Sequence, residues 1–400
     1  MKIVFANNYH YMRGGSERVY FNEQHWLTQA GHQVAAFSRR HCDNLAAEHA
    51  DLFPPAVDFQ QLGGVGKITG AARLMHSRRA GKAFSKMLDR TRPDVVHAHN
   101  IYGGLTTSIL AAAKGRQPIV MTLHDYKLIC PSYLMLARNK PCKACVNGGV
   151  WHCVWNRCHK SSLIASALYT AETCFNRWLG RYDAVDRFIC PSRFLLELHA
   201  QAGIDRRRLV YLPNAIPLER FAPAWGGQYI LYVGRLSKEK GVATLIEAAG
   251  RAGAPLHIVG TGPIEPELRT LAASCKANVT FRGHLAGAEL AEAFRNALAV
   301  VVPSEWYENC PMSVLESFAY GKAVIGARIG GIPEFVIHRR TGLLFDPGDA
   351  EALEACISDL WEREDRAIAI GRRARALVEE QLDARSHVES LLQIYREVKK

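Results

Sequence analysis

Short runs of apolar, β-branched residues alternate along the chain with segments whose apolar residues recur every three or four positions. In the first half, the apolar runs are KIVFAN, QVAAFS, DVVHAH, PIVMTL, DRFICP and LVYLP. Helical spacing occurs in SERVYFNEQHWLTQAG and near residues 72–91, 104–114, 161–181 and 193–202. Because strands that alternate with helices build βαβ units, this pattern predicts a parallel α/β sheet.

A stretch rich in Pro, Gly and Ala, PNAIPLERFAPAWGGQ at 213–228, interrupts the pattern and is typical of a linker. A second alternating series follows, with the apolar runs YILYVG, PLHIVG, NVTFRG, AVVVPS and AVIGA. The chain has 400 residues, more than one hydrophobic core usually serves. We therefore predict two doubly wound α/β domains, with ligands bound at the carboxyl ends of their strands.

Composition and the start of the chain suggest a compartment. Apolar residues make up 48% and charged residues 22%, as in ordinary globular proteins. No run of about 18 uncharged apolar residues occurs, and MKIVFANNYHYMRGG lacks the features of a signal peptide. We therefore expect a cytoplasmic protein whose 11 cysteines are thiols or metal ligands rather than disulfides.

The net charge of +12 is unevenly distributed. Residues 1–221 hold 29 Lys and Arg against 15 Asp and Glu, whereas the remainder holds 21 against 23. A basic half is typical of proteins with an anionic partner, such as nucleic acid, anionic lipid or a phosphorylated acceptor. A solvated cationic face without a specific partner is the alternative.

Several loops that follow predicted strands could hold phosphate. Gly14 and Gly15 precede a helix, where free backbone N–H groups meet the positive end of the helix dipole. In VGRLSKEKG, Arg235 and Lys240 bracket a turn, so two cations suit a diphosphate there. The segment IVGTGPIEPEL offers Gly260 and Gly262, but no third glycine completes a dinucleotide fingerprint. A nicotinamide dehydrogenase therefore loses its main support.

Two glutamates eight positions apart flank the start of another helix. In SEWYENCPMSVLES, Glu308 falls in the loop after the run AVVVPS, and Glu316 falls two turns into the helix. Pro311 suits the first helical position, so backbone N–H groups nearby are free to receive phosphate or hydroxyl oxygens. The two carboxylates could accept hydrogen bonds from a transferred sugar and from a ribose.

At this point the sequence resembles the retaining glycosyltransferases of family 4, which have the two-Rossmann-domain GT-B fold. The matching motifs, in the family's order over nearly the whole chain, are RGGSERV, TLHDY (122–126), VGRLSKEKG (233–241), VGTGP (259–263), the Glu308–Glu316 spacing and GGIPE (330–334). The resemblance implies an acceptor-binding domain over 1–215, a nucleotide-sugar-binding domain over 216–383, and a final helix at 384–400 that packs back on the first domain. It also implies catalysis in the cleft without a catalytic metal.

The resemblance carries roles to the donor-site residues. Arg235 and Lys240 would contact the diphosphate, Glu316 the ribose, and Gly15 would approach the phosphates beside Gly14. Glu308 would hold the sugar. The neighbouring donor-site residues would be Asn309, Cys310, Pro311, Met312 and Ser313, together with Gly260 and Gly262. Many family members have glycine where this chain has Asn309, a difference that could change which sugar is accepted.

His124 of TLHDY would reach the sugar from the opposite domain, so His124 and Glu308 are the expected catalytic pair. A histidine that merely hydrogen-bonds its own turn is the alternative. The retained anomeric configuration implies front-face substitution through an oxocarbenium-like species. The departing phosphate would then help to deprotonate the acceptor hydroxyl. We expect a nucleotide-diphosphate sugar donor and a glycan or lipid-pyrophosphate-linked acceptor, with a hexose transferred in bacterial surface-polysaccharide synthesis.

Five cysteines fall within 29 residues of an insert at 130–160. The Cys142-x2-Cys145 spacing is typical of structural zinc, and thiolates suit a closed tetrahedral site. The expected ligands are Cys130, Cys142, Cys145 and Cys158, with Cys153 as the alternate. Unliganded thiols and disulfides are the other interpretations. Similar inserts occur in some family members linked to bacterial surface polysaccharides.

Two further segments suggested sites. HAHN at 97–100 places two histidines on one face of a strand, but no third metal ligand is evident, so acceptor contact or core packing is favoured. The segment 73–90 carries a basic arc of Arg78, Arg79, Lys82, Lys86 and Arg90 opposite apolar residues. Such a helix suits an anionic membrane surface at the inner face of the cell membrane, or a solvated face over a buried stripe.

Two other functions remain as alternatives. A zinc-containing nucleic-acid-binding protein would explain the basic half and the cysteines, but not the phosphate loops and paired glutamates of the other half. We therefore expect no nucleic-acid partner. A sugar-nucleotide epimerase on the same fold would use the same donor half without a large acceptor surface.

Overall fold

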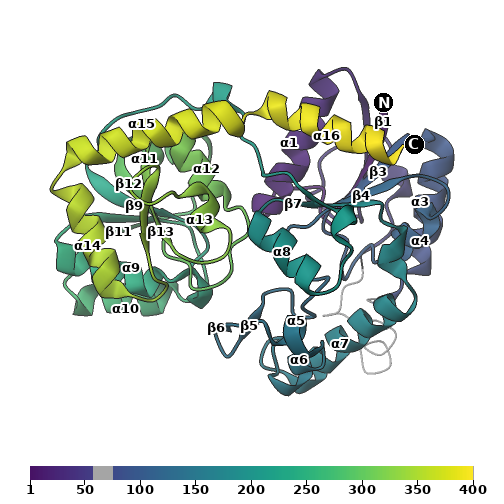
Figure 1. Cartoon of the computed structure of the whole chain (residues 1–400), viewed down its shortest axis with the longest axis horizontal. Helices are drawn as coiled ribbons and strands as arrows, with labels where there is room; N and C mark the ends of the chain where they lie inside the picture. Colours follow the sequence, from purple (N-terminus) through teal and green to yellow (C-terminus); the bar gives the residue numbers. More distant parts are fainter. Residues whose placement is uncertain (57–74, 400) are drawn as a thin grey trace.

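The computed structural model describes residues 1–56 and 75–399. Two six-stranded parallel sheets, each covered by helices, form two lobes (Figure 1). The strands of the first sheet, in spatial order, are β2 (Gln33–Phe37), β1 (Lys2–Ala6), β3 (Val95–Ala98), β4 (Ile119–Thr122), β7 (Arg187–Cys190) and β8 (Leu209–Tyr211). Those of the second are β11 (Val279–Gly283), β10 (Leu256–Val259), β9 (Tyr229–Val233), β12 (Ala297–Val302), β13 (Ala323–Ala327) and β14 (Gly342–Phe345). The predicted fold class, two doubly wound α/β units, is confirmed.

Helices connect the strands and cover both faces of each sheet (Figure 1). In the first lobe they are α1 (Gly15–Gln29), α3 (Arg78–Thr91), α4 (Ser108–Ala113), α5 (Ala144–Gly148), α6 (His152–Trp155), α7 (Leu163–Trp178) and α8 (Arg193–Gln201). In the second they are α9 (Val242–Ala252), α10 (Glu265–Ser274), α11 (Gly287–Arg295), α12 (Met312–Ala319), α13 (Ile332–Phe335), α14 (Ala350–Trp361) and α15 (Glu364–Gln381). A last helix, α16 (Ala384–Val398), ends the described chain.

Sequence analysis missed β14, the four residues GLLF. It also missed a small hairpin in the cysteine insert, β5 (Leu136–Ala137) and β6 (Lys140–Pro141). The helix expected from 72 begins at Arg78, where Ser77 caps it, and residues 72–74 lie outside the described part. Within residues 1–56 and 75–399, no helix combines the length and apolar character needed to cross a bilayer.

Helix α16 leaves the second lobe and packs across the first sheet, beside α1 and β4 (Figure 1). Its Leu391 and Tyr395 are buried in a cluster with Phe5 of β1. Polar contacts add to this packing, since the Tyr395 hydroxyl lies 2.7 Å from His97 Nδ1. His387 Nε2 likewise lies 3.1 Å from a carboxylate oxygen of the buried Glu23. The last helix is therefore part of the core of the first lobe.

Burial of His97 predicts acid sensitivity. Desolvation lowers the pKa of His97 to about 4, although Glu23 acts in the opposite direction. Between pH 6.5 and 4 the unfolded chain therefore binds a proton that the folded chain does not. We expect the free energy of unfolding, measured with urea, to fall by up to about 1.4 kcal/mol per pH unit from this group as the pH drops through that window.

The His97→Gln variant should show a shallower pH dependence than the wild type, whereas the exposed His284→Gln control should not. Equal slopes in the wild type and His97→Gln would contradict the neutral, buried state of His97.

Candidate active site

The loops that follow β9 and β12 meet at the point where the strand order of the second sheet reverses. Such a switch point forms a crevice at the carboxyl ends of parallel strands. The β9 loop carries Arg235 and Lys240, and the β12 loop carries Glu308. The topology therefore brings the cations and the first glutamate to one edge of the sheet.

Glu308 is buried and is bound directly to Lys240. One carboxylate oxygen accepts hydrogen bonds from Lys240 Nζ at 2.7 Å, Ser304 Oγ at 2.6 Å and Trp306 Nε1 at 2.8 Å. Burial alone would raise the pKa of Glu308, but the charge of Lys240 and these hydrogen bonds outweigh it and lower the pKa. The ammonium also lies 5.0 Å from the centre of the Trp306 ring. Glu308 is therefore an anion held in one orientation.

Close backbone packing holds these two loops together. Gly241 has a φ of +66°, and a Cβ there would lie 1.9 Å from the Pro303 carbonyl oxygen. Gly330 of GGIPE has a φ of +60°, and a Cβ there would lie 2.2 Å from the Glu308 carbonyl oxygen. Both positions need glycine for conformation and for space. The glycines of two motifs thus fix where Lys240 and Glu308 sit.

Arg235 lies near this pair but is more exposed. Its guanidinium binds the Glu239 carboxylate at 2.5 Å and Ser237 Oγ at 3.3 Å, and 64% of its side chain is accessible. Gly260 and Gly262 support its loop, because Cβ atoms there would lie about 2 Å from the carbonyl oxygens of Gly234 and Leu236. In the structure, these two glycines therefore pack on the Arg235 loop.

Two helix N-termini face each other across the lobes. Helix α1 begins at Gly15, with Gly14 as its N-cap, and α12 begins at Met312, after Pro311. A Cβ on Gly15 would lie only 3.6 Å from Met312 Cγ. The free N–H groups and positive dipole ends of both helices therefore meet at one place, which favours an anion. Ser313 lies in the first turn of α12.

Glu316, one turn further along α12, forms an ion pair with Arg18 of α1. The carboxylate is buried, and the lobes are bridged directly by this contact. Burial lowers the pKa of Arg18. Sequence analysis did not single out Arg18, although it lies within RGGSERV, three residues after Gly15.

Asn309 joins the loop after β12 to the first lobe. Its amide nitrogen donates to the Leu123 carbonyl oxygen at 3.1 Å, and its amide oxygen accepts from Ser192 Oγ at 2.7 Å. The next residue, Cys310, is buried, which raises the pKa of its thiol to about 12, and its carbonyl oxygen accepts from Asn214. The residue that departs from the family pattern therefore contacts the other lobe.

Glu334 of GGIPE makes a similar bridge that sequence analysis left without a role. Its carboxylate accepts from the backbone N–H groups of Arg193 and Phe194 at 2.8 and 2.7 Å, which are at the start of α8. An acidic residue stabilises a helix N-terminus through these bonds and the helix dipole. A single Glu in the GGIPE motif carried no sequence signal that its partner would be a helix in the other half.

His124 lies just beyond the end of β4, next to Leu123, which contacts Asn309. His124 Nε2 lies 2.8 Å from His99 Nδ1, and the two rings stack. Burial lowers the pKa of His124 to about 4, so the ring is neutral at pH 7.

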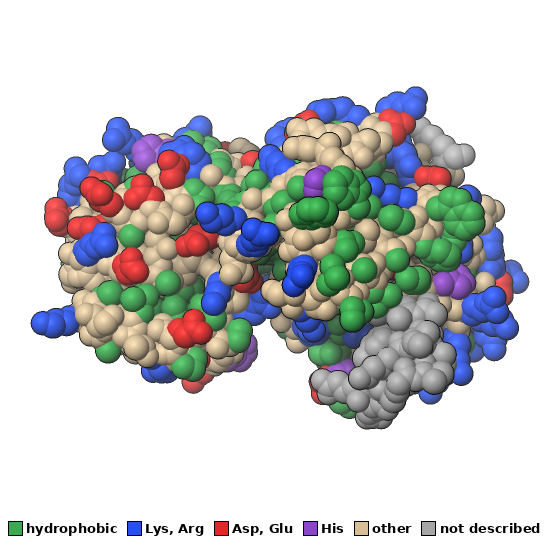
Figure 2. Space-filling view, turned by 90° about the horizontal axis from the view of Figure 1, so that it is seen from below, with side chains coloured by type: hydrophobic (Ala, Val, Ile, Leu, Met, Phe, Trp, Pro, Cys, Tyr) green, Lys and Arg blue, Asp and Glu red, His purple; other side chains and the backbone are tan. Residues whose placement is uncertain are grey.

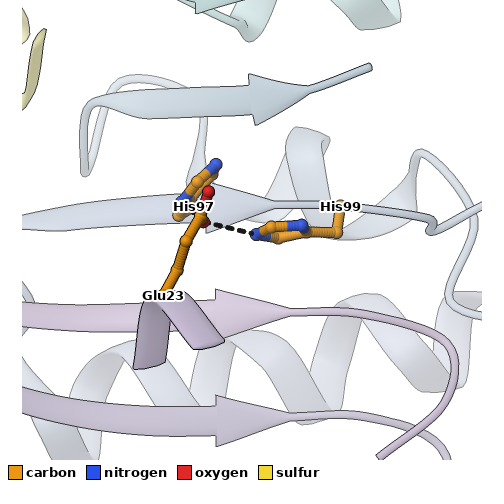
Figure 3. Close-up of side chains that lie close together, drawn as sticks. All are labelled: Glu23, His97 and His99. Carbon is orange, nitrogen blue, oxygen red and sulfur yellow. Dashed lines mark ion pairs between the residues drawn. The ribbon is translucent and has the colours of Figure 1, made fainter. Parts of the chain in front are cut away.

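Behind His124 lies a buried cluster of Glu23, His97 and His99 (Figure 3). Glu23 Oε2 lies 3.6 Å from His97 Nδ1 and from His99 Nε2. The structure therefore adds a carboxylate, that of Glu23, to the two histidines of HAHN, for which the sequence showed no third metal ligand. The role favoured for His97, core packing, fits its bonds to Thr122 and Tyr395. His99 instead supports His124.

The first lobe contains a cavity of about 240 Å³ whose lining includes Asp125, the residue that follows His124 in the chain. It is lined by aromatic and polar side chains, among them Tyr9, Tyr102, Asp125, Tyr133 and Tyr169. Burial raises the pKa of Asp125 to about 6. Sequence analysis did not predict this cavity, because the walls of the cavity come from four separate segments of the chain.

The five insert cysteines converge below this cavity. A small cavity of about 10 Å³ is lined by Cys130, Cys142, Cys145 and Cys158, with His152 nearby, whereas Cys153 is fully buried. The Ala144 N–H donates to Cys142 Sγ at 3.4 Å. No three of these five sulfurs lie within 4.8 Å of one another.

The basic helix α3 does not present an apolar face. Ala80, Phe84, Met87 and Leu88 are buried in the core of the first lobe, and Arg90 pairs with Asp51 at 2.9 Å. Of the two interpretations, the solvated basic face over a buried stripe describes this helix.

The chain is similar in sequence and fold to known proteins. The family model described as Glycosyltransferase Family 4 matches residues 13–220, and that described as Glycosyl transferases group 1 matches residues 218–377. A D-inositol 3-phosphate glycosyltransferase of Pseudarthrobacter chlorophenolicus is 33% identical over 398 residues, with 90% of this chain and 86% of that protein covered.

The sulfoquinovosyl transferase SQD2 of Arabidopsis thaliana is 29% identical over 311 residues, or 72% of this chain. The matched part spans about half of that relative, 53% of its length. The crystal structure of Anabaena Alr3699/HepE in complex with UDP and glucose superposes with a TM-score of 0.69 at 17% identity, over 99% of this chain and 100% of that one. That likeness shows the GT-B fold. The chain belongs to glycosyltransferase family 4.

Proposed function

We propose that the protein is a retaining glycosyltransferase that moves a hexose-type sugar from a nucleotide-diphosphate donor to a glycan or lipid-linked acceptor. Three contacts carry this proposal: two helix N-termini approach at Gly15 and Met312, Lys240 pairs with Glu308 at the switch point, and Glu316 reaches across the lobes to Arg18. A diphosphate would accept hydrogen bonds from the free amides near Gly15 and Met312. A bacterial role in surface-polysaccharide synthesis, in the cytoplasm, is part of the proposal.

In this mechanism the leaving diphosphate is stabilised electrostatically. Lys240 and Arg235 would supply positive charge, and the amides of both helices would supply fixed dipoles, where negative charge develops. The ribose would compete with Arg18 for Glu316, so donor binding would replace the bridge between these side chains. The departing phosphate would take up the acceptor proton, and no protein base is required.

On the sugar side, Glu308 would accept hydrogen bonds from the sugar hydroxyl groups while Lys240 keeps it ionised. His124 would face the sugar as a neutral ring, whose hydrogen bond to His99 fixes its orientation. A neutral imidazole can exchange hydrogen bonds with hydroxyl groups without adding a positive charge beside an oxocarbenium-like centre. The buried Glu23 and His99 would hold His124 in place from behind.

The acceptor would occupy the cavity that contains Asp125 and the tyrosines, since Asp125 directly follows His124 in the chain. Aromatic faces with a few polar groups suit a carbohydrate or another polar ring-bearing acceptor. A separate acceptor cavity also distinguishes transfer from epimerisation, because an epimerase needs only the donor half. The cavity contains a paired Lys127 and Glu172 rather than a continuous cationic track, so nucleic acid fits it poorly.

The first prediction concerns the diphosphate cation. Lys240→Ala should abolish the rise in thermal midpoint that a matching UDP- or GDP-sugar causes in the wild type, because ligand stabilisation follows affinity for the native state. Lys238→Ala, an exposed lysine in the same turn, is the matched control and should retain the rise. A normal shift in Lys240→Ala would contradict the donor site.

The second prediction concerns the buried carboxylate. Glu308→Gln keeps the shape of the side chain but removes its charge, and should lower kcat for sugar transfer by about 100-fold. Product analysis by NMR, or by chromatography that separates epimers, with and without acceptor, distinguishes the activities. If the donor is epimerised when no acceptor is present, the protein is an epimerase and the proposed transferase activity is contradicted.

We also propose that the insert binds one structural zinc ion through Cys130, Cys142, Cys145 and Cys158. These four thiols line one cavity, and an amide that donates to Cys142 Sγ is the kind of contact that stabilises a liganding thiolate. Thiolates and Zn²⁺ would draw the four sulfurs closer together than they are without the ion. His152 and Cys153 are the alternates. The ion would hold the insert together.

The third prediction tests this ion. Full-length protein purified without chelator should carry about one zinc per chain by elemental analysis. Cys142→Ser/Cys145→Ser should lose it, while Cys174→Ser, an exposed cysteine of α7, should keep it. A chelator should also lower the thermal midpoint of the wild type. Zinc-free wild type, iron in place of zinc, or a disulfide between these cysteines would overturn the zinc site.

A further inference from the structure

Helix α7 buries its polar face and exposes its apolar face. Its exposed face carries Ile164, Ala167, Ala171, Cys174 and Trp178, spaced three or four residues apart. Ile164 and Trp178 are each 81% exposed. A surface helix of a globular protein normally turns such a stripe toward the core. The exposed stripe of α7 is therefore a face without a partner among the described residues.

The buried face of α7 is polar, and most of its side chains are bonded within the protein. Buried Ser166, Thr170, Glu172, Thr173 and Asn176 make up this face. The Glu172 carboxylate pairs with Lys127 at 2.6 Å and accepts from the Asn176 amide at 2.6 Å. Thr107 donates to the Asn176 oxygen at 2.6 Å. These bonds fix the orientation of the helix, so the apolar stripe cannot turn inward without breaking them.

Neighbouring segments extend the apolar face. Trp151 and Trp155, at helix α6, are 56% and 77% exposed, and Leu163 and Leu179 flank the ends of α7. Helices α5, α6 and α7 lie together on one side of the first lobe in Figure 1, and Figure 2, seen from that side, shows hydrophobic side chains gathered there. The exposed apolar residues between 151 and 179 are called the α6–α7 face below.

The charges around this face have one sign. Between Asp125 and Asp183 the chain holds eight Lys and Arg against one acidic residue, Glu172. Glu172 is buried with Lys127, so seven cations remain without an acid of this segment. Arg157, Lys160 and Arg177 are exposed beside the apolar residues. Exposed tryptophans with Lys and Arg are the composition of an interfacial membrane contact.

We propose that the α6–α7 face docks on the surface of an anionic lipid bilayer. The tryptophans and Ile164 would enter the boundary between headgroups and acyl chains, while Arg157, Lys160 and Arg177 contact anionic headgroups. A second copy of the chain is disfavoured as the occupant, because a symmetric contact through this face would bring the same cations together. The site differs from the basic arc of α3, which has no free apolar face.

The two faces of this helical region connect the bilayer with the acceptor. Leu168, Tyr169 and Glu172 of α7 line the 240 Å³ cavity, while the outer stripe of the same helix faces outward. If the proposed function holds, a lipid-linked acceptor could reach the cavity without leaving the membrane surface. Docking itself does not depend on that function, because it requires only the α6–α7 face.

Vesicle co-sedimentation of the full-length protein tests the docking. We expect binding to vesicles of phosphatidylglycerol and phosphatidylcholine, weaker binding to phosphatidylcholine alone, and partial loss at high salt. Ile164→Ser/Trp178→Ser should reduce partition into the anionic vesicles at least tenfold, because two apolar side chains leave the interface. Leu45→Ser/Ile337→Ser, which removes two exposed apolar side chains elsewhere, should leave binding unchanged.

Other outcomes overturn the proposal. Wild-type protein that does not bind anionic vesicles removes the membrane as partner. If vesicle binding survives in Ile164→Ser/Trp178→Ser but is lost in Arg78→Glu/Lys82→Glu, the membrane contact is made by α3 instead. A dimer in analytical ultracentrifugation that Trp178→Ser dissociates makes the face a protein interface. Donor-induced thermal shifts, measured on the same samples, report separately whether the sugar-nucleotide site is intact.

Discussion

The account rests on the approach of two helix N-termini from different lobes, where Gly15 of α1 packs against Met312 of α12. A Cβ at position 15 would lie 3.6 Å from Met312 Cγ, an ordinary van der Waals contact, so the two helix starts with their free amides lie close together. Around this contact the lobes are joined by few but specific bonds, among them Arg18 to Glu316, Asn309 to Leu123 and Glu334 to the start of α8. Each of them joins a motif of one half to a segment of the other.

The same constraint explains why the motif glycines matter. Gly241 and Gly330 let the loops around Lys240 and Glu308 approach to backbone contact, so that a buried anion and its cation form one fixed pair. A carboxylate with no such partner would be protonated or displaced at this depth. In the first lobe, Glu23 contacts buried histidines in a row that ends at the neutral ring of His124. Structure behind the cleft thus sets the charge and orientation of the groups that face it.

Much of this was predictable from sequence because it depends on local patterns. Apolar runs predicted eleven of the twelve strands of the two sheets, and β14 was the strand that was missed. Loop position placed Lys240 near Glu308 because both follow strands at the switch point. Arg18, Glu334 and the walls of the cavity beside Asp125 were not predictable, because each acts through a partner more than 100 residues away or through several segments at once. The outward apolar stripe of α7 looked like an ordinary amphipathic helix, since periodicity does not say which face is buried.

The most direct test of the central claim compares a nucleoside diphosphate with the matching monophosphate by isothermal titration calorimetry. If the paired helix N-termini and Lys240 bind the second phosphate, the diphosphate should bind at least tenfold more tightly, and the difference should shrink in Lys240→Ala. Equal affinity for the two nucleotides in the wild-type protein would contradict a diphosphate site between the lobes.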